Sequence, residues 1–424
     1  MYKIYYKILF YLKGGILRDM KITSIIAEYN PLHNGHIYHI NKTKEITSSD
    51  AIVCIMSGNY VQRGIPALVD KWSRTKAALE SGIDLVIELP ALYALSSAEF
   101  FAFGAISLLD SLNIIDSICF GSEIGNIDYI LEISNILNNE TEAFKKSLKY
   151  YLNKGFTYPA ARSKALYNYI LDKNIYFENN LHEILNSSNN ILAIEYCKSL
   201  IKLNSNIKPY TIKREGSSYN STKLSKIFSS ATSIRRYIKN NNNFNELKNH
   251  IPDASFNMLN LYKNSGVQFV FEDLMFDFIK YKHFNSEHEI ENLPDVSEGL
   301  HNRISKALKS AKNFDDLIEN IKTKRYTYTR INRILCQYFI GFEKFNTKIL
   351  RTTPCPYARI LGFNEIGIKI LKEMKEKSSI PIYTKLPKNA DDILLLDIQS
   401  TKSYSILNKY IDHNSDYIIS PIKV

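Results

Sequence analysis

Two histidines in the run His33-Asn34-Gly35-His36 have the residue types and spacing that phosphate chemistry needs. Imidazoles three positions apart share one face of a helix, so both can donate hydrogen bonds to oxygens whose negative charge grows in a transition state. The glycine between them lets a ligand approach the backbone, and a helix N-terminus offers N–H groups and a positive dipole end to phosphate. The run therefore predicts a phosphate-binding helix start with two charge-stabilising side chains.

The run fits the HxGH signature of nucleotidylyltransferases, in which a nucleophile attacks the α-phosphate of a nucleoside triphosphate and pyrophosphate leaves. It follows an apolar strand and the turn Asn30-Pro31, and this context makes it more specific than the bare pattern. A surface helix with polar histidines is the plainer interpretation. Metal binding by His33, His36 and His39 is a third, which the drift of positions i, i+3 and i+6 around a helix disfavours.

A second cluster, Ser230-Ala231-Thr232-Ser233-Ile234-Arg235, opens a later predicted helix. In HxGH enzymes such a turn grips the β and γ phosphates, with hydroxyls and amides on the anion and the arginine on the leaving pyrophosphate. We therefore expect Ser230, Thr232 and Arg235 at the nucleotide. By itself the cluster is equally a good helix cap.

Three other positions follow predicted strands or open helices. Gly121 either lets adenine or ribose lie against the backbone or is a simple turn glycine, and Arg214 is either a phosphate or ribose contact or a solvated arginine. The pair Asn189-Asn190 could read a base edge or ribose, or cap a helix.

The charged residues near the second loop, Arg63, Lys71 and Arg74, add positive potential there, but we expect each to be a solvated surface charge. Trp72 is expected in the core. The sequence has no GxxxxGKS/T phosphate loop, no GxSxG elbow and no HExxH, so other common catalytic classes are not supported.

Apolar runs and helical segments alternate through the first third of the chain. Such strands, apolar throughout, predict an α/β fold with a Rossmann-like parallel sheet covered on both faces, whose ligands collect at the carboxyl ends of the strands. Ser96 and Glu99 form a predicted capping box. The predicted strands are 22–27, 51–56, 85–89 and 118–120, the helices begin near 34, 70 and 100, and the converging loops are 28–36, 57–64 and 121–123.

The chain of 424 residues is long enough for two or three domains. We expect residues 1–19 to be an extension or a misassigned start, residues 20–240 to form the nucleotidyltransferase domain, and residues 241–424 to form a mainly helical domain with a small mixed α/β tail. In that tail, 380–383 and 393–398 look like strands.

Composition favours a polyanionic partner, because the formal net charge is +11. Five dispersed cysteines without a CxxC pair argue against disulfides and structural zinc, so we expect a reducing, cytoplasmic compartment, and no membrane span is evident. Residues 303–351 contain twelve Lys/Arg against four Asp/Glu, interleaved with aromatics, which suits RNA, although a charged helix face has the same composition. The residues predicted to bind tRNA are Lys324, Arg325, Tyr326, Arg330 and Arg333.

These motifs together resemble those of the bacterial tRNA-Met cytidine acetate ligases over nearly everything from Met20 onward. The departures are Leu32, where the family usually has Phe, and the N-terminal 19 residues. The matching segments are 27–36, 56–58 with 61–64, 120–123, 189–192 with 194–196, 212–214, 230–235, 297–300 and 359–363.

The resemblance implies that ATP and acetate give acetyl-adenylate and pyrophosphate, and that the acetyl group then passes to the wobble cytidine of elongator tRNA-Met as N4-acetylcytidine. It implies His33 and His36 as the catalytic residues, and magnesium is expected with ATP. The residues it implies for ATP binding are Ile26, Ala27, Glu28, Tyr29, Asn30, Pro31, Leu32, His33, Asn34, Gly35, His36, Ile37, Tyr38, His39, Gly121, Asn189 and Arg214.

Two rival functions remain open on the residues alone. One is a small-molecule nucleotidylyltransferase acting on a phosphorylated metabolite, with the C-terminal half used for oligomerisation. The other is a non-catalytic RNA-binding protein on a retired scaffold, against which intact His33, Gly35, His36 and Arg235 argue.

Overall fold

The computed structural model describes residues 20–173, 184–185, 187–214 and 228–424. The predicted extension 1–19 lies outside these residues. Within them, no helix has the length and apolar character needed to cross a membrane. All five cysteines are buried and free.

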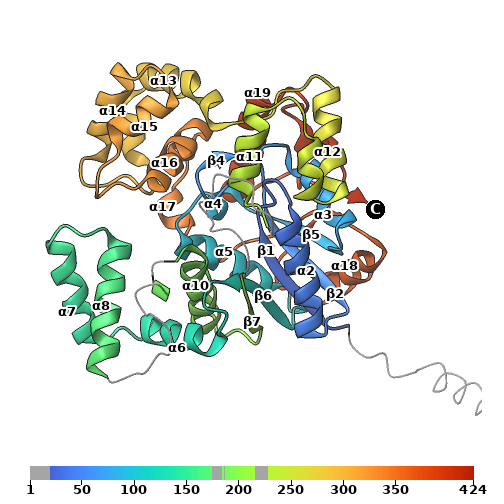
Figure 1. The fold of residues 1–424 in the computed structure, drawn as a ribbon, viewed down its shortest axis with the longest axis horizontal. Helices are drawn as coiled ribbons and strands as arrows, with labels where there is room; N and C mark the ends of the chain where they lie inside the picture. Colours follow the sequence, from blue (N-terminus) through green and yellow to red (C-terminus); the bar gives the residue numbers. More distant parts are fainter. Residues whose placement is uncertain (1–19, 174–183, 186, 215–227) are drawn as a thin grey trace, which may run out of the picture.

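Eight of the described strands form one sheet in the order β10-β8-β5-β2-β1-β6-β7, with β9 paired to β8 (Figure 1). Neighbouring strands from β5 to β7 are parallel, and β8 runs antiparallel to β5. The strands are β1 Ile22–Ala27, β2 Ala51–Ser57, β5 Leu85–Leu89, β6 Ser117–Ser122, β7 Lys208–Lys213, β8 Ala358–Phe363, β9 Ile382–Tyr383 and β10 Ile422–Lys423; β3 Tyr60–Val61 and β4 Ile65–Pro66 form a separate hairpin.

Helices cover both faces of the sheet, as the apolar strands predicted. Side chains of α2 (Asn34–Thr47) and α3 (Lys71–Glu80) share one buried cluster with one face of β1, β2 and β5. Those of α5 (Ala98–Ser111) and α10 (Ser188–Lys202) pack with the opposite face. Strands β2 and β5 are buried along their whole length because both faces are covered.

The strand order reverses at β1, and this places the ligand crevice. From β1 the chain moves through β2 to β5 on one side, and then returns to β6 and β7 on the other. Side chains at the carboxyl ends of β1 and β6 therefore border a crevice at the topological switch point, where such sheets bind ligands.

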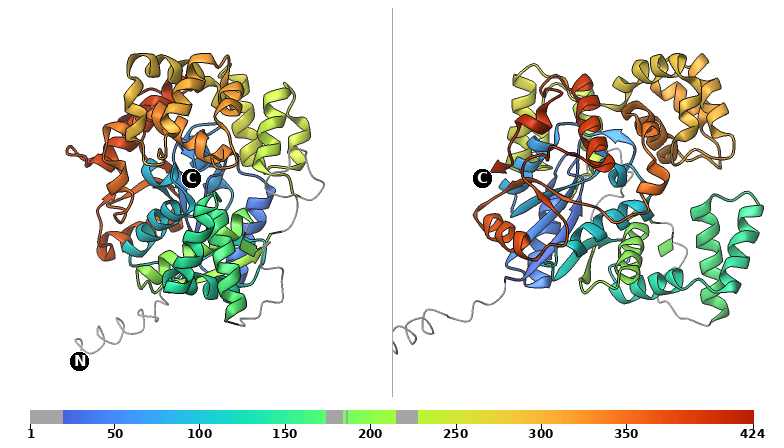
Figure 2. Two further views of the ribbon diagram at one scale, coloured as in Figure 1. Left: turned by 90° about the vertical axis from the view of Figure 1, so that its left-hand side faces the viewer. Right: turned by 180° about the vertical axis from the view of Figure 1, so that it is seen from behind.

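Helices that lie beyond the sheet form projecting parts of the molecule. Figures 1 and 2 show a hairpin of α7 and α8 and a lobe of α13 to α17 projecting from the same side. The bounds of these helices and of others outside the sheet are α6 Ile127–Asn138, α7 Glu142–Asn153, α8 Tyr158–Asp172, α11 Ala231–Asn240, α12 Asp253–Asn264, α13 Phe276–Asn285, α14 Leu300–Ser310, α15 Phe314–Ile321, α16 Tyr328–Ile340, α17 Thr347–Leu350, α18 Glu365–Lys377 and α19 Asp392–Leu407.

Two local predictions are wrong. Residues 393–398 are not a strand but part of α19, and the helix near residue 100 begins at Ala98 behind Ser97, with no side-chain capping bond. Ser96 instead donates its hydroxyl to the carbonyl of Leu92, 2.7 Å away. A short apolar run fits either a strand or a buried helix, and the choice depends on what covers it.

The C-terminal residues return to the sheet. Strands β8 and β10 lie beyond β5, so the sheet contains segments from both sides of the predicted boundary at residue 240. The division into domains at that residue stays a prediction.

Candidate active site

The two predicted histidines lie together at the start of α2. His33 is the extended residue before the helix, and its N–H donates to Nδ1 of His36 at 3.1 Å. The two rings stack with centroids 3.8 Å apart, and Tyr29 packs edge-on against His36 at 5.0 Å. Because Nδ1 of His36 accepts, a neutral His36 carries its proton on Nε2, where it is a donor.

Gly35 keeps His33 in this position. A Cβ at residue 35 would lie 3.0 Å from Cε1 and 3.1 Å from Nδ1 of His33, closer than side chains normally pack. The backbone N–H of Asn34 is already taken by the carbonyl of His250 at 3.0 Å, so the helix start is less open than the sequence suggested. Glycine is therefore needed here for the close approach of the His33 imidazole.

Three histidines, His33 before α2 and His36 and His39 within it, border the pocket as neutral groups. Burial, and then the charge of Arg214, lowers the pKa of His33 to about 3 and that of His39 to about 4. Burial lowers the pKa of His36 well below its usual range, and His33 and Arg214 add to the effect. At neutral pH these side chains are hydrogen-bonding groups, and the positive charge beside them belongs to Arg214.

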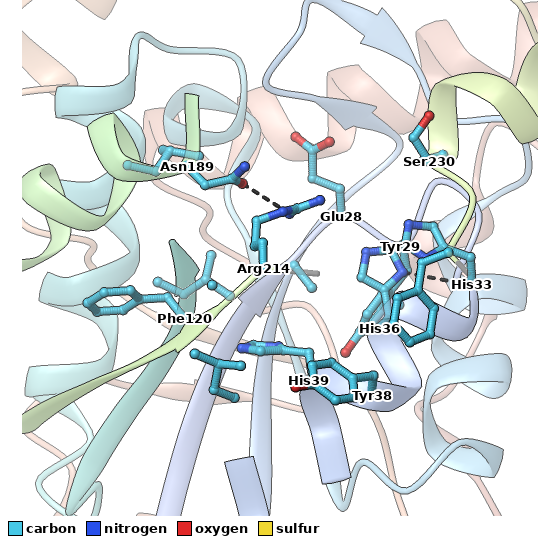
Figure 3. Close-up of a pocket in the computed structure, with 18 of the residues that line it drawn as sticks. Glu28, Tyr29, His33, His36, Tyr38, His39, Phe120, Asn189, Arg214 and Ser230 are labelled. Carbon is cyan, nitrogen blue, oxygen red and sulfur yellow. Dashed lines mark hydrogen bonds between the residues drawn. The ribbon is translucent and has the colours of Figure 1, made fainter. Parts of the chain in front are cut away.

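Arg214 follows β7 and points into the pocket beside Asn189 and the histidines (Figure 3). Its Nη1 donates to Oδ1 of Asn189 at 3.2 Å. A Cβ on Gly121 would lie 3.1 Å from Cγ of Arg214, so the glycine leaves room for the arginine stem. Gly121, Asn189 and Arg214, from three separate sequence motifs, thus form one wall.

Asn189 is held by Glu123, a residue that the sequence analysis did not single out. One carboxylate oxygen accepts from Nδ2 of Asn189 at 2.7 Å and the other from the N–H of Asn190 at 2.8 Å. Oδ1 of Asn190 in turn accepts from the N–H of Glu123 at 2.9 Å. This reciprocal pair joins the loop after β6 to the N-terminus of α10 and fixes the direction of Asn189.

Glu28 contributes a carboxylate at the end of β1. Its Oε1 accepts from the N–H of Gln62 at 2.8 Å. Burial raises the pKa of Glu28, and Arg63, Arg74 and Arg235 oppose the rise. In Figure 3 the carboxylate points to the side of the pocket away from His39.

Of the three residues predicted to bind the β and γ phosphates, only Ser230 lines the pocket. Ser230 lines the pocket and caps α11 by accepting from the N–H of Ser233 at 3.1 Å. Thr232 is not in the lining; its hydroxyl lies 3.5 Å from Nη1 of Arg63. Arg235 lies behind the pocket, where it donates to Oδ1 of Asn30 at 3.0 Å and pairs with Glu272 at 3.1 Å. The phosphate contacts of these three residues stay predictions.

The expectation that Lys71 and Arg74 are solvated is wrong. Both are almost completely buried. Arg74 donates to the carbonyl oxygens of Glu28 at 2.7 Å and Ser57 at 3.1 Å, and also to Gly58, so it fixes the loops that follow β1 and β2. Buried cations need such partners, and carbonyls from distant loops leave no mark in the local sequence.

Most, but not all, of the predicted nucleotide residues line this pocket. Those behind or beside it are Pro31, Leu32, Asn34, Ile37, Thr232 and Arg235. The lining residues that were not predicted are Gln62, Phe101, Phe120, Leu192, Tyr196, Ile212, Lys213, Phe228, Ser229 and Ala231. Gln62, Phe120, Leu192, Tyr196, Ile212, Lys213 and Ala231 belong to motifs already noted, whereas Phe101 looks like a core position of a helix.

The predicted tRNA-binding residues run from the loop after α15 into the first turns of α16, and their charges are partly paired. Arg330 donates to the backbone carbonyl of Asp295 at 2.9 Å. Nε of Arg333 lies 3.5 Å from the side-chain carboxylate of the same residue. Arg325 forms an exposed pair with Glu298. Lys324 is exposed and Tyr326 is largely buried. Whether they bind RNA stays a prediction.

A pocket at the switch point with an HxGH helix start defines a nucleotidyltransferase. Residues 20–417 match the family model of the HIGH nucleotidyl transferases, so the chain belongs to that family. The chain is 62% identical over 406 residues to a tRNA(Met) cytidine acetate ligase of Clostridium novyi (strain NT), covering 95% of this chain and 99% of the relative. It is 55% identical over 404 residues to the protein of that name from Clostridium tetani, covering 95% of this chain and 100% of the relative. The resemblance indicated by the motifs is confirmed.

Solved structures of similar proteins have the same fold as this chain. Thermotoga maritima TmcAL in its apo form has a TM-score of 0.89 and 34% identity, covering 96% of this chain and 100% of that chain. A second form, bound with alpha-thio ATP, has a TM-score of 0.87 and 33% identity over the same shares of the two chains. The predicted α/β nucleotidyltransferase fold is therefore confirmed.

Proposed function

We propose that this chain is an ATP-dependent ligase that activates acetate as acetyl-adenylate and transfers the acetyl group to the wobble cytidine of elongator tRNA-Met. Membership of the nucleotidyltransferase family and relatives named tRNA(Met) cytidine acetate ligase support the proposal. The observation that carries it is the stacked pair His33 and His36 facing a pocket that also contains Arg214.

In the first step a carboxylate oxygen of acetate attacks the α-phosphorus of ATP, and the bond to pyrophosphate breaks. Neutral His36 donates from Nε2 to an oxygen that gains charge, and Arg214 adds its full positive charge nearby. Acetate is thereby joined to AMP, which is a good leaving group.

In the second step the N4 amine of cytidine attacks the acetyl carbonyl carbon, AMP departs with the bonding electron pair, and N4 loses a proton. The base must be unstacked to reach a pocket of this kind. We place this reaction in the cytoplasm, where tRNA is used.

Magnesium belongs to the same proposal. Among the described residues that line the pocket, Glu28 is the carboxylate, which fits an ion held by one carboxylate and the nucleotide's own phosphates. Glu28 is the residue that would hold it, and the ion would neutralise phosphate charge when bound.

The test uses the intact protein with ATP, radiolabelled acetate and elongator tRNA-Met. Label is expected in the tRNA, and a transcript with uridine at the wobble position should take up none. Acetate-independent turnover of ATP with a phosphorylated metabolite, and no label in tRNA, would instead support the small-molecule nucleotidylyltransferase.

A further inference from the structure

The hairpin of α7 and α8 projects from the sheet and is stabilised by contacts of its own. Phe144 on α7 and Leu166 on α8 are almost completely buried, and Nδ2 of Asn168 donates to the hydroxyl of Tyr151 at 2.9 Å. Figures 1 and 2 show the hairpin on the same side of the molecule as the α13–α17 lobe. Its remaining surface is therefore exposed to solvent on this flank.

That surface is strongly basic. Residues 142–173 contain seven Lys/Arg and two Asp/Glu, a formal charge of +5 within a chain of +11. The lysines of the hairpin are all exposed: Lys145, Lys146, Lys149, Lys154, Lys164 and Lys173. The one arginine, Arg162, is used internally, because it pairs with the buried Glu195.

Exposed aromatic rings lie among these lysines. Tyr150 and Tyr158 are 52% and 47% exposed, and Tyr167 is 41% exposed. Nζ of Lys154 lies 4.4 Å from the ring centroid of Tyr150. Lysines that neutralise a backbone and rings on which bases stack are the combination that unpaired nucleic acid requires.

The base of the hairpin is fixed to the helix that borders the nucleotide pocket. Glu195 on α10 pairs with Arg162 of α8 and lies 3.3 Å from Lys198. Ser163 donates to the carbonyl of Leu185 at 3.2 Å. Since α10 begins at the Asn189 wall of the pocket, the basic surface has a set position relative to the reaction.

We propose that the α7–α8 hairpin is a tRNA-binding surface, separate from residues 324–333, that contacts the phosphate backbone and unpaired bases of the tRNA whose cytidine enters the pocket. This inference rests on the proposed function. Charge favours RNA over a second copy of the chain, because two surfaces of +5 in molecules of +11 repel each other.

The experiment compares two triple variants of the full chain. One replaces Lys149, Lys154 and Lys164 of the hairpin with Ala. The matched control replaces Lys369, Lys372 and Lys375 with Ala; these lysines are also exposed and lie on α18, across the sheet from the hairpin in Figure 1. Both variants lose three charges, so a difference between them reports position and not net charge.

Binding of elongator tRNA-Met is measured at several salt concentrations, with ATP–pyrophosphate exchange as the check on folding. The hairpin variant should bind roughly tenfold more weakly, and its slope of log affinity against log salt should fall by about 2, since each phosphate contact contributes about 0.7 on single strands. The α18 variant should match the wild type. A further variant, Tyr150→Ala, should lose roughly fivefold in affinity with an unchanged salt slope, because it removes stacking and no charge.

The outcomes separate this inference from the function on which it rests. If the wild type acetylates tRNA and the hairpin variant binds it with wild-type affinity and salt slope, the hairpin is not a tRNA surface. If the hairpin variant instead loses binding only to anionic lipid vesicles, the surface belongs to a membrane and the inference is likewise overturned. If the wild type neither binds nor acetylates tRNA, the proposed function itself fails.

Discussion

In the proposed mechanism His33 and His36 contribute hydrogen bonds and not charge, because burial and Arg214 keep both imidazoles neutral. A neutral His36 whose Nδ1 accepts from a backbone N–H has one ring donor, Nε2, and His36 lines the pocket. Because both imidazoles are neutral, the guanidinium of Arg214 does not lie beside two further cations.

Replacing His36 with Ala should slow acetate-dependent ATP–pyrophosphate exchange by about 100- to 1000-fold, the usual cost of removing one transition-state donor. Affinity for tRNA should remain close to that of the wild type. His288→Ala is the control, since that side chain is 96% exposed. Equal exchange rates in the His36 variant and the wild type would remove this histidine from the chemistry.

The depressed pKa of His33 should also appear in stability. The unfolded chain takes up a proton near pH 6.5, whereas the folded chain does not until about pH 3, so folding stability is present above pH 6.5 and declines as the pH falls below it. Between pH 7 and pH 5 one such group accounts for about 2 kcal/mol. His33→Asn should therefore lose about 2 kcal/mol less than the wild type over this range in urea unfolding, and a decline of equal size in both proteins would contradict the assignment.

At the scale of elements, the loop after β6 and the start of α10 act as one unit. Glu123 touches neither of the histidines, yet it orients Asn189, which accepts from Arg214. By this contact Glu123 positions the pocket wall formed by Gly121, Asn189 and Arg214.

Glu123→Ala should raise the KM for ATP by about 5- to 30-fold, as loss of a charge-assisted bond pair predicts, and should change kcat less. Steady-state exchange kinetics separate the two constants. Glu142→Ala is the matched control, because it also removes an acid at a helix start but at an 82% exposed position. A fall in kcat at constant KM would show that Glu123 acts in some other way.

The sequence predicted the elements that carry the histidines because strand β1, its turn and α2 are all specified locally. The apolar strands also predicted burial on both faces, and the order of loops predicted their convergence at one edge. It could not predict Glu123, which bonds to residues 66 and 67 positions away, or the burial of Lys71 and Arg74, whose partners lie on other loops. Residues 393–398 were misassigned because their apolar run has no distinct helical or strand period.

On the scale of the whole molecule, the C-terminal segment completes the sheet through a buried charge network. Asp416 accepts from Lys71 at 2.9 Å and from Arg359 at 2.8 Å, and both cations also contact Glu88 on β5. Burial alone would raise the pKa of Asp416, but Lys71 and Arg359 hold it below its usual range. Two cations and two carboxylates thus join α3, β5, β8 and the chain end.

Asp416→Asn leaves Lys71 and Arg359 with one carboxylate in a site that water does not reach. Breaking a buried pair by removing one partner costs about 3–5 kcal/mol, because the remaining charge is uncompensated. Urea unfolding should show this loss as a lower midpoint. Glu373→Ala is the control, since its pair with Lys377 is on the surface and should contribute no more than about 0.5 kcal/mol. A loss of under about 1 kcal/mol for Asp416→Asn would mean that strand pairing and apolar packing alone hold β8 and β10 in the sheet, and that the four charges are not what anchors the chain end.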